Sequence, residues 1–106
     1  GTFPYLVGRF DLMHARADHG AQAITAQKPP SGYVEKLTFD TIVHAPKTLR
    51  FLADSMGLER LVLGTDESFP PADTDPVGHL KDAGFSAAEI ETISEATPRK
   101  IFTRIK

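Results

Sequence analysis

LTFDTIVHAPKTLRFLADSMGLERLVLGTD, residues 37–66, is the stretch that decides the fold. Its first part, Leu37–Val43, alternates with the period of two that is typical of a β-strand. Pro46 suits the first turn of a helix, whose apolar residues recur at i, i+3, i+4 and i+7, and Gly57 follows as its stop. The apolar run Leu61–Gly64 then indicates a short buried strand. A strand, a helix and a strand in this order predict a crossover between two parallel strands covered by helices.

The flanking segments predict further helices but no third strand. Before the crossover we expect a helix over residues 3–17, an irregular segment over 18–30 and a short helix over 31–36. After it we expect a Pro/Asp-rich loop over 67–75, a helix over 77–83 and a second helix that opens with a capping box at Ser86 and Glu89. A last helix is expected to begin at Thr97 and to bury Ile101, Phe102 and Ile105. Two parallel strands leave unpaired edges and do not make a self-sufficient sheet. The sequence therefore predicts an incomplete α/β domain whose missing part lies upstream.

Composition restricts the class of protein. The 106 residues are 41% hydrophobic and 25% charged, which is typical of one small globular domain. The formal charge of −2 comes from 12 basic and 14 acidic residues spread along the chain, so we expect neither nucleic acid nor a membrane surface as a partner. Without cysteine the chain has no disulfide and no thiolate metal site, and it shows no signal peptide or membrane span. We expect a cytoplasmic location.

Polar residues follow both predicted strands, at the end where α/β proteins bind ligands. Asp66 follows the run Leu61–Gly64 after Thr65, where a carboxylate is placed to bind a divalent cation and to accept a proton from bound water. The alternative is a turn or N-cap aspartate. His44 follows the first strand and has either a role at the substrate or a structural one, whereas His14, His19 and His79 are expected at the surface.

Four segments carry a resemblance to a known family. They are GTFPYLVGRFD (1–11), FDTIVHAPKTLRFLADSMGLER (39–60), LVLGTDESFP (61–70) and, more loosely, ISEATPRKIF (93–102). Together they resemble the aminocarboxymuconate-semialdehyde decarboxylase-like family of the amidohydrolase superfamily, which are metal-dependent barrel enzymes. The chain departs from the family's pattern at Glu95, where an asparagine is usual, and at Glu67, which either alters substrate preference or faces solvent.

This resemblance implies the fold class and the site. Residues 1–106 would form a single partial domain, the C-terminal part of a (β/α)8 TIM barrel with about its last two parallel strands. Asp66 matches the metal-ligating aspartate after the eighth strand, with zinc as the expected ion. Arg9 matches an arginine that binds a substrate carboxylate across a homodimer, a task that suits its planar fork. The family's histidine ligands and catalytic histidine would precede Gly1, so the fragment alone would be inactive.

The implied function is that of a metal-dependent decarboxylase or hydrolase acting on a small carboxylated ring or enoate. The alternatives are a hydrolase or hydratase of the same superfamily, or an inactive fragment with only a structural role. Upstream His-x-His and H-G-G-G motifs would decide between the enzymatic and the inactive reading.

Overall fold

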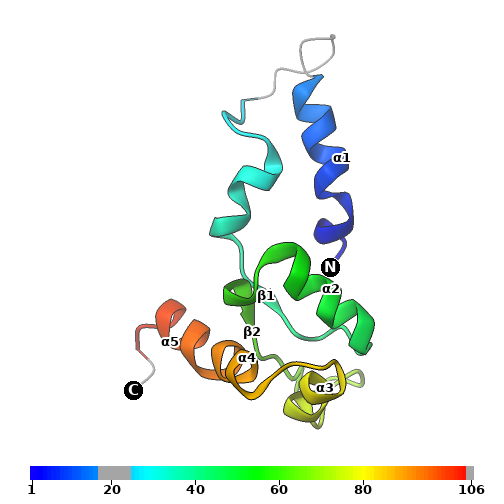
Figure 1. Ribbon diagram of the computed structural model, residues 1–106, viewed down its shortest axis with the longest axis vertical. Coiled ribbons are helices and arrows are strands. Elements are labelled where there is room, and N and C mark those ends of the chain that lie inside the picture. The colour runs from blue at the N-terminus through cyan, green and yellow to red at the C-terminus, as the bar shows by residue number, and fades with distance from the viewer. Residues whose placement is uncertain (17–24, 105–106) are drawn as a thin grey trace. The chain divides into compact units, whose positions relative to one another are not determined.

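The computed structural model describes residues 1–16 and 25–104, so the expectations for His19 and Ile105 lie outside the described residues. The chain divides into two compact units, Gly1–Leu37 and Thr38–Lys106, each described here by itself (Figure 1). The expectation of a single partial domain over residues 1–106 stays a prediction.

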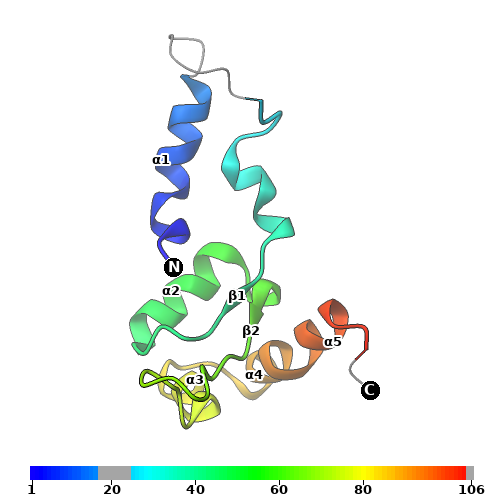
Figure 2. The same cartoon turned by 180° about the vertical axis from the view of Figure 1, so that it is seen from behind.

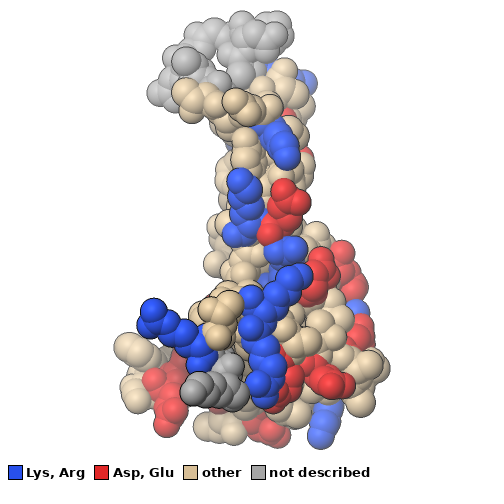
Figure 3. Space-filling view, turned by 90° about the vertical axis from the view of Figure 1, so that its left-hand side faces the viewer, with Lys and Arg blue, Asp and Glu red and all other residues tan. Residues whose placement is uncertain are grey.

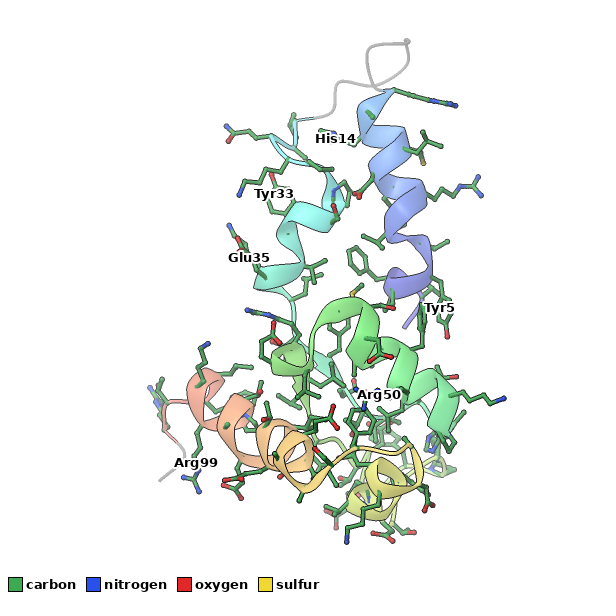
Figure 4. All side chains as sticks on the ribbon, in the orientation of Figure 1. Tyr5, His14, Tyr33, Glu35, Arg50 and Arg99 are labelled. Carbon is green, nitrogen blue, oxygen red and sulfur yellow. The ribbon has the colours of Figure 1, made fainter. Side chains whose placement is uncertain are left out.

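The first unit consists of the helix α1 (Phe3–Ala15) and the 3₁₀-helix η2 (Pro30–Lys36), which pack on each other. Pro4 is buried in the first turn of α1, where its missing N–H leaves no hydrogen bond unmade. Two polar contacts tie the unit together. The Ser31 N–H donates to Asp11 Oδ1 at 2.9 Å, and His14, which is directed from α1 toward the opposite segment in Figure 4, bonds through Nε2 to the Ala26 carbonyl oxygen at 2.9 Å.

The second unit contains the predicted crossover. In chain order its elements are β1 (Phe39–Asp40), α2 (Pro46–Met56), η3 (Leu58–Arg60), β2 (Leu61–Val62), α3 (Pro76–Asp82), α4 (Ala87–Glu91), η4 (Thr92–Ala96) and α5 (Thr97–Ile101). The strands are parallel, with Phe39 opposite Leu61 and Asp40 opposite Val62, and they run side by side in Figure 1 and from behind in Figure 2. The α/β class and the parallel pair are therefore confirmed.

Both strands are shorter than predicted, because side chains and a tight turn take over the hydrogen bonds of the backbone. Asp40 Oδ1 accepts from the Ile42 N–H at 2.9 Å, and the Val43 N–H turns back to the Thr41 carbonyl at 2.9 Å. On the other strand the Gly64 N–H donates to Thr41 Oγ1 at 3.1 Å, not to a backbone oxygen. The alternating pattern up to Val43 identified the strand but not its end.

The core of the second unit lies between the strands and their helices. Its buried apolar side chains are Leu49, Leu52, Ala53, Met56, Leu61, Leu80, Phe85 and Ile93. The first four form the predicted stripe of α2, which is thereby confirmed. α2 packs against α3, and β2 packs against both η4 and α5.

The burial predicted for the last helix is wrong. Ile101 is 41% exposed and Phe102 is 52% exposed, whereas Thr97 is buried. Ile101 lies one turn after the buried Thr97, on the same face of α5, but it is the last residue of the helix. Phe102 is the C-cap, with φ of −100° and ψ of 78°, and no longer belongs to the helical face on which the sequence placed it. The helix therefore ends before the predicted apolar face is complete.

Acidic and basic side chains both occur on the face shown in Figure 3. This agrees with a chain whose 12 basic and 14 acidic residues are spread along its length. Among the described residues no helix has the length and apolar character needed to cross a membrane.

Arg50 connects α2 to α4. Its Nη2 donates to Glu89 Oε1 at 2.9 Å, its Nε donates to Asp54 Oδ1 at 3.0 Å, and its guanidinium carbon lies 4.3 Å from the centre of the buried Phe85 ring. Figure 4 labels Arg50 at this position. Glu89 also completes the predicted capping box with Ser86. The hydrogen bond from Arg50, followed by that from the Ser86 N–H, lowers the pKa of Glu89 from its ordinary value of 4.5 to about 2.

Replacing Glu89 by glutamine should therefore change how acid destabilises the fold. A carboxyl group whose pKa is lower in the folded state contributes stability above its unfolded pKa of 4.5, and that stability is lost as pH falls toward about 2. Glu89→Gln preserves the capping box but not the charge, so its free energy of unfolding should fall less steeply than that of the wild type over this range. Urea unfolding at several pH values measures the slopes. The exposed Glu91→Gln is the control, and equal slopes for Glu89→Gln and wild type would contradict the assignment.

Candidate functional site

The carboxyl ends of β1 and β2 meet at one edge because the strands are parallel and in register. The two chain segments remain close together beyond the paired residues. A Cβ added to Gly64 would lie 3.2 Å from Asp40 Cβ and 3.1 Å from Ile42 Cγ1. His44 and Asp66 follow this edge in the two segments, four residues after the end of each strand. The structure thus places both residues at the carboxyl end of the strand pair, and their roles there stay predictions.

Asp66 is exposed and stands in the left-handed region, with φ of 49°. Ser68, two residues on, has φ of 78°. Such conformations cost a non-glycine residue on the order of 1 kcal/mol, aspartate less than most. A turn holds this backbone, because the Phe69 N–H donates to the Asp66 carbonyl at 3.1 Å. Among the described residues nothing forms a hydrogen bond or ion pair with the Asp66 carboxylate, which leaves it available to a ligand.

His44 stands at the start of α2 with φ of 49°. It lines a small pocket together with Thr41, Ala45, Pro46, Leu49, Asp73 and His79. The pocket joins the end of β1 to the start of α3, but Asp66 is not among its lining residues. The two predicted residues therefore share an edge without sharing this pocket.

Asp73 and His79 form a pair that sequence reasoning missed. The Asp73 side chain is 4% exposed, and its Oδ2 lies 2.7 Å from His79 Nδ1 on α3. Its Oδ1 accepts from the Asp75 N–H at 2.9 Å, and Asp75 in turn caps α3 by accepting from the Gly78 N–H. His79 is exposed, as expected, with about half of its side chain open to solvent, but its ring also bonds to Asp73. The signal in the sequence was Asp75-Pro76, an N-cap and first-turn proline.

The pair shifts both pKa values. Burial raises the pKa of Asp73, but the hydrogen bond from His79, that from the Asp75 N–H and the charges of His79 and His44 outweigh it, so the net shift is downward. The hydrogen bond to Asp73 raises the pKa of His79 above its ordinary value, against a smaller opposing effect of burial. Each partner therefore favours the charged form of the other.

Arg9 lies on the exposed face of α1, in the first unit. Tyr5 and Met13, one turn before and after it, are 60% and 59% exposed. This stripe gives the guanidinium free access to a partner or ligand.

The donors of this chain fit a divalent cation only in part. The Asp66 carboxylate supplies the hard oxygen that such ions prefer. Within residues 1–16 and 25–104, however, no group of three or more His, Asp or Glu side chains is placed to hold a metal ion. Asp66 would serve as one ligand of a set completed by other residues.

Comparison with solved structures assigns the fold. The crystal structure of 5-carboxyvanillate decarboxylase LigW from Sphingomonas paucimobilis matches with a TM-score of 0.81 and 21% identity, over 96% of this chain and 31% of that one. At this identity the likeness establishes the fold alone. The chain has the fold of part of a TIM barrel, as the sequence predicted.

Sequence comparison finds one relative to which nearly the whole chain is similar. The chain is 35% identical over 102 residues to the 2-amino-3-carboxymuconate-6-semialdehyde decarboxylase of Dictyostelium discoideum, a match that covers 95% of this chain and 26% of that protein. No family model matches the chain. The chain spans about a quarter of this relative's length and is similar to that part of it. The resemblance carried by its motifs is confirmed.

The left-handed conformation of Ser68 leads to a stability prediction. Glycine adopts a φ of 78° without the steric cost that serine has, so Ser68→Gly should raise the free energy of unfolding by about 0.4–1 kcal/mol. Ser55→Gly, at an exposed position inside α2, should lower it by about 0.5–1 kcal/mol, because glycine is a poor helix former. Thermal and urea unfolding measure both. A loss of stability in Ser68→Gly would contradict the conformation at this loop.

Proposed function

We propose that this chain supplies the last two strands, and the site edge that they form, of a metal-dependent decarboxylase acting on a small carboxylated ring or enoate. The observation that carries the proposal is the 35% identity to a decarboxylase over 95% of the chain. Asp66 adds to it, because an exposed carboxylate at the carboxyl end of β2 occupies the position where barrel enzymes hold their reacting groups.

Asp66 is proposed to hold the divalent ion, with zinc as the expected metal and the remaining ligands outside this chain. The bound ion would supply Lewis acidity and a water of lowered pKa. The part of Asp66 is to bind as a hard anionic ligand and to accept a proton at a carboxylate oxygen. The open surroundings of its side chain support both tasks.

Arg9 is proposed to bind a substrate carboxylate. A guanidinium presents two parallel N–H groups to the two oxygens of a carboxylate, a geometry that lysine does not reproduce. In this proposal the exposed face of α1 reaches the site of a second subunit in a homodimer. A cytoplasmic location, compatible with a chain that has no cysteine, completes the proposal.

A hydrolase or hydratase of the same superfamily is the second candidate, because one barrel and one metal site host several reactions. An inactive fragment with only a structural role is the remaining alternative. Release of carbon dioxide from a carboxylated substrate by the full natural protein distinguishes the decarboxylase from both. Absence of turnover and of bound metal would leave only the structural reading.

Asp66→Asn tests the proposed metal ligand. Asparagine is nearly isosteric, so the fold should persist, but a neutral amide oxygen is a weaker ligand and a poor proton acceptor. Metal content should fall, and turnover should drop by a factor on the order of 10² or more. Metal analysis and steady-state rates of the full natural protein provide the measurements. Glu91→Gln, which removes an exposed carboxylate outside the proposed site, serves as the control. Full metal content with near-normal turnover in Asp66→Asn would reduce Asp66 to a turn residue.

Arg9→Lys tests the proposed carboxylate anchor. The charge remains but the bidentate fork is lost, so substrate binding should weaken by about 1–3 kcal/mol, observed as a higher KM. Arg16→Lys, at the exposed end of α1, is the matched control. If KM and kcat are unchanged in Arg9→Lys, Arg9 has no contact with substrate.

A further inference from the structure

We infer that Asp73 and His79 form a positioning pair that holds the loop backbone carrying Asp66. The inference rests on the proposed function, because it concerns how the proposed ligand is held in place. Neither residue is proposed as a metal ligand. Both act through the backbone between Thr65 and Asp73.

The main chain of Asp73 closes this loop. Its N–H donates to the Thr65 carbonyl at 2.7 Å, so the residue before Asp66 is bonded to the residue that ends the loop. Within the loop, the Phe69 N–H bonds to the Asp66 carbonyl and the Ala72 N–H bonds to the Phe69 carbonyl, at 3.1 and 3.0 Å. Asp66 therefore lies in a loop with two internal backbone hydrogen bonds, and the bond from the Asp73 N–H to Thr65 closes that loop at the end of the strand.

The side chain of Asp73 fixes the closing residue to α3. One carboxylate oxygen accepts from the Asp75 N–H at the start of the helix, and the other bonds to His79, one turn further on, at 2.7 Å. Asp73 is buried among exposed neighbours, since Thr74 and Asp75 after it and residues 65–71 before it are exposed. The loop thus has no apolar core of its own, and its place depends on these polar bonds.

The left-handed residues explain why such an anchor is needed. Asp66 and Ser68 are both held at positive φ, which a free loop relaxes unless its surroundings determine it. The Thr65–Asp73 bond holds the two ends of the loop together, and the Asp73–His79 bond attaches the loop to α3. Together they restrict the backbone at Asp66 and Ser68. His44, whose charge acts on Asp73, lies with the pair around the same pocket.

Asp73→Asn removes the charge of the pair and leaves one oxygen where the carboxylate uses two. With its oxygen toward His79, its NH2 group faces the Asp75 N–H, donor against donor. With its oxygen toward Asp75, its NH2 group bonds to His79 Nδ1 only when the imidazole is neutral, so the charged pair is lost in either orientation. His79→Ala removes the partner outright, whereas His79→Gln keeps a neutral donor. Asp82→Asn, an exposed carboxylate on the same helix, is the matched control.

The experiment measures amide hydrogen exchange and metal affinity in the full natural protein. In Asp73→Asn and His79→Ala we expect the amides of Phe69, Ala72 and Asp73 to exchange at least about tenfold faster, with smaller changes in His79→Gln and none in Asp82→Asn. Titration of metal-free protein with Zn²⁺ should show a Kd raised about tenfold in the first two variants, with Tm recorded alongside.

A purely structural role gives a different result. If Asp73→Asn and His79→Ala lower Tm but leave loop exchange and the Zn²⁺ Kd at wild-type values, the positioning role is overturned. If the wild-type protein binds no Zn²⁺ and releases no carbon dioxide, the proposed function fails. In that event the exchange rates alone decide whether the pair holds the loop.

Discussion

The parallel pairing of β1 with β2 is the constraint on which the second unit depends. Parallel strands need a long connection, which α2 and η3 supply, and the connection must bury an apolar face to remain in place. Leu61 is fully buried in β2, and Leu49, Leu52 and Met56 cover the helix face that packs on the core. Because both strands point the same way, their carboxyl ends form one edge. That edge, and no single residue, makes a site possible in so short a chain.

The sequence predicted those features whose contacts join residues three or four positions apart. The α2 stripe and the Ser86–Glu89 capping box follow from spacings of three and four, and both are present. The position of Asp66 at a strand end followed from the apolar run before it. The strand ends did not follow, because Asp40 and Thr41 capture backbone N–H groups with their side chains. The π-helical segment η4 likewise has no pattern that spacing alone reveals, and neither does the end of α5 at Ile101, which leaves Phe102 outside the helix.

Asp73 was missed for a related reason. In the sequence it belongs to a Pro/Asp-rich loop, where acidic residues are ordinarily solvated. Its burial depends on where α3 lies, because the helix brings His79 back to within 2.7 Å of its carboxylate. Its backbone bond to Thr65 joins positions eight residues apart. A spacing rule does not capture a contact that exists only after a loop has closed on the end of a strand.

The second unit contains two ion pairs that stabilise different parts of the structure. Arg50 and Glu89 join two helices over the buried ring of Phe85, so that apolar contact and charge act on the same packing. Asp73 and His79 instead hold a loop whose own residues are largely exposed. A loop that presents a carboxylate to a ligand is unable to bury that residue in the core, since burial would remove access and favour the neutral acid. Hydrogen bonds at the two ends of the loop hold its backbone without burying Asp66. The side chain of Asp66 therefore stays open to solvent.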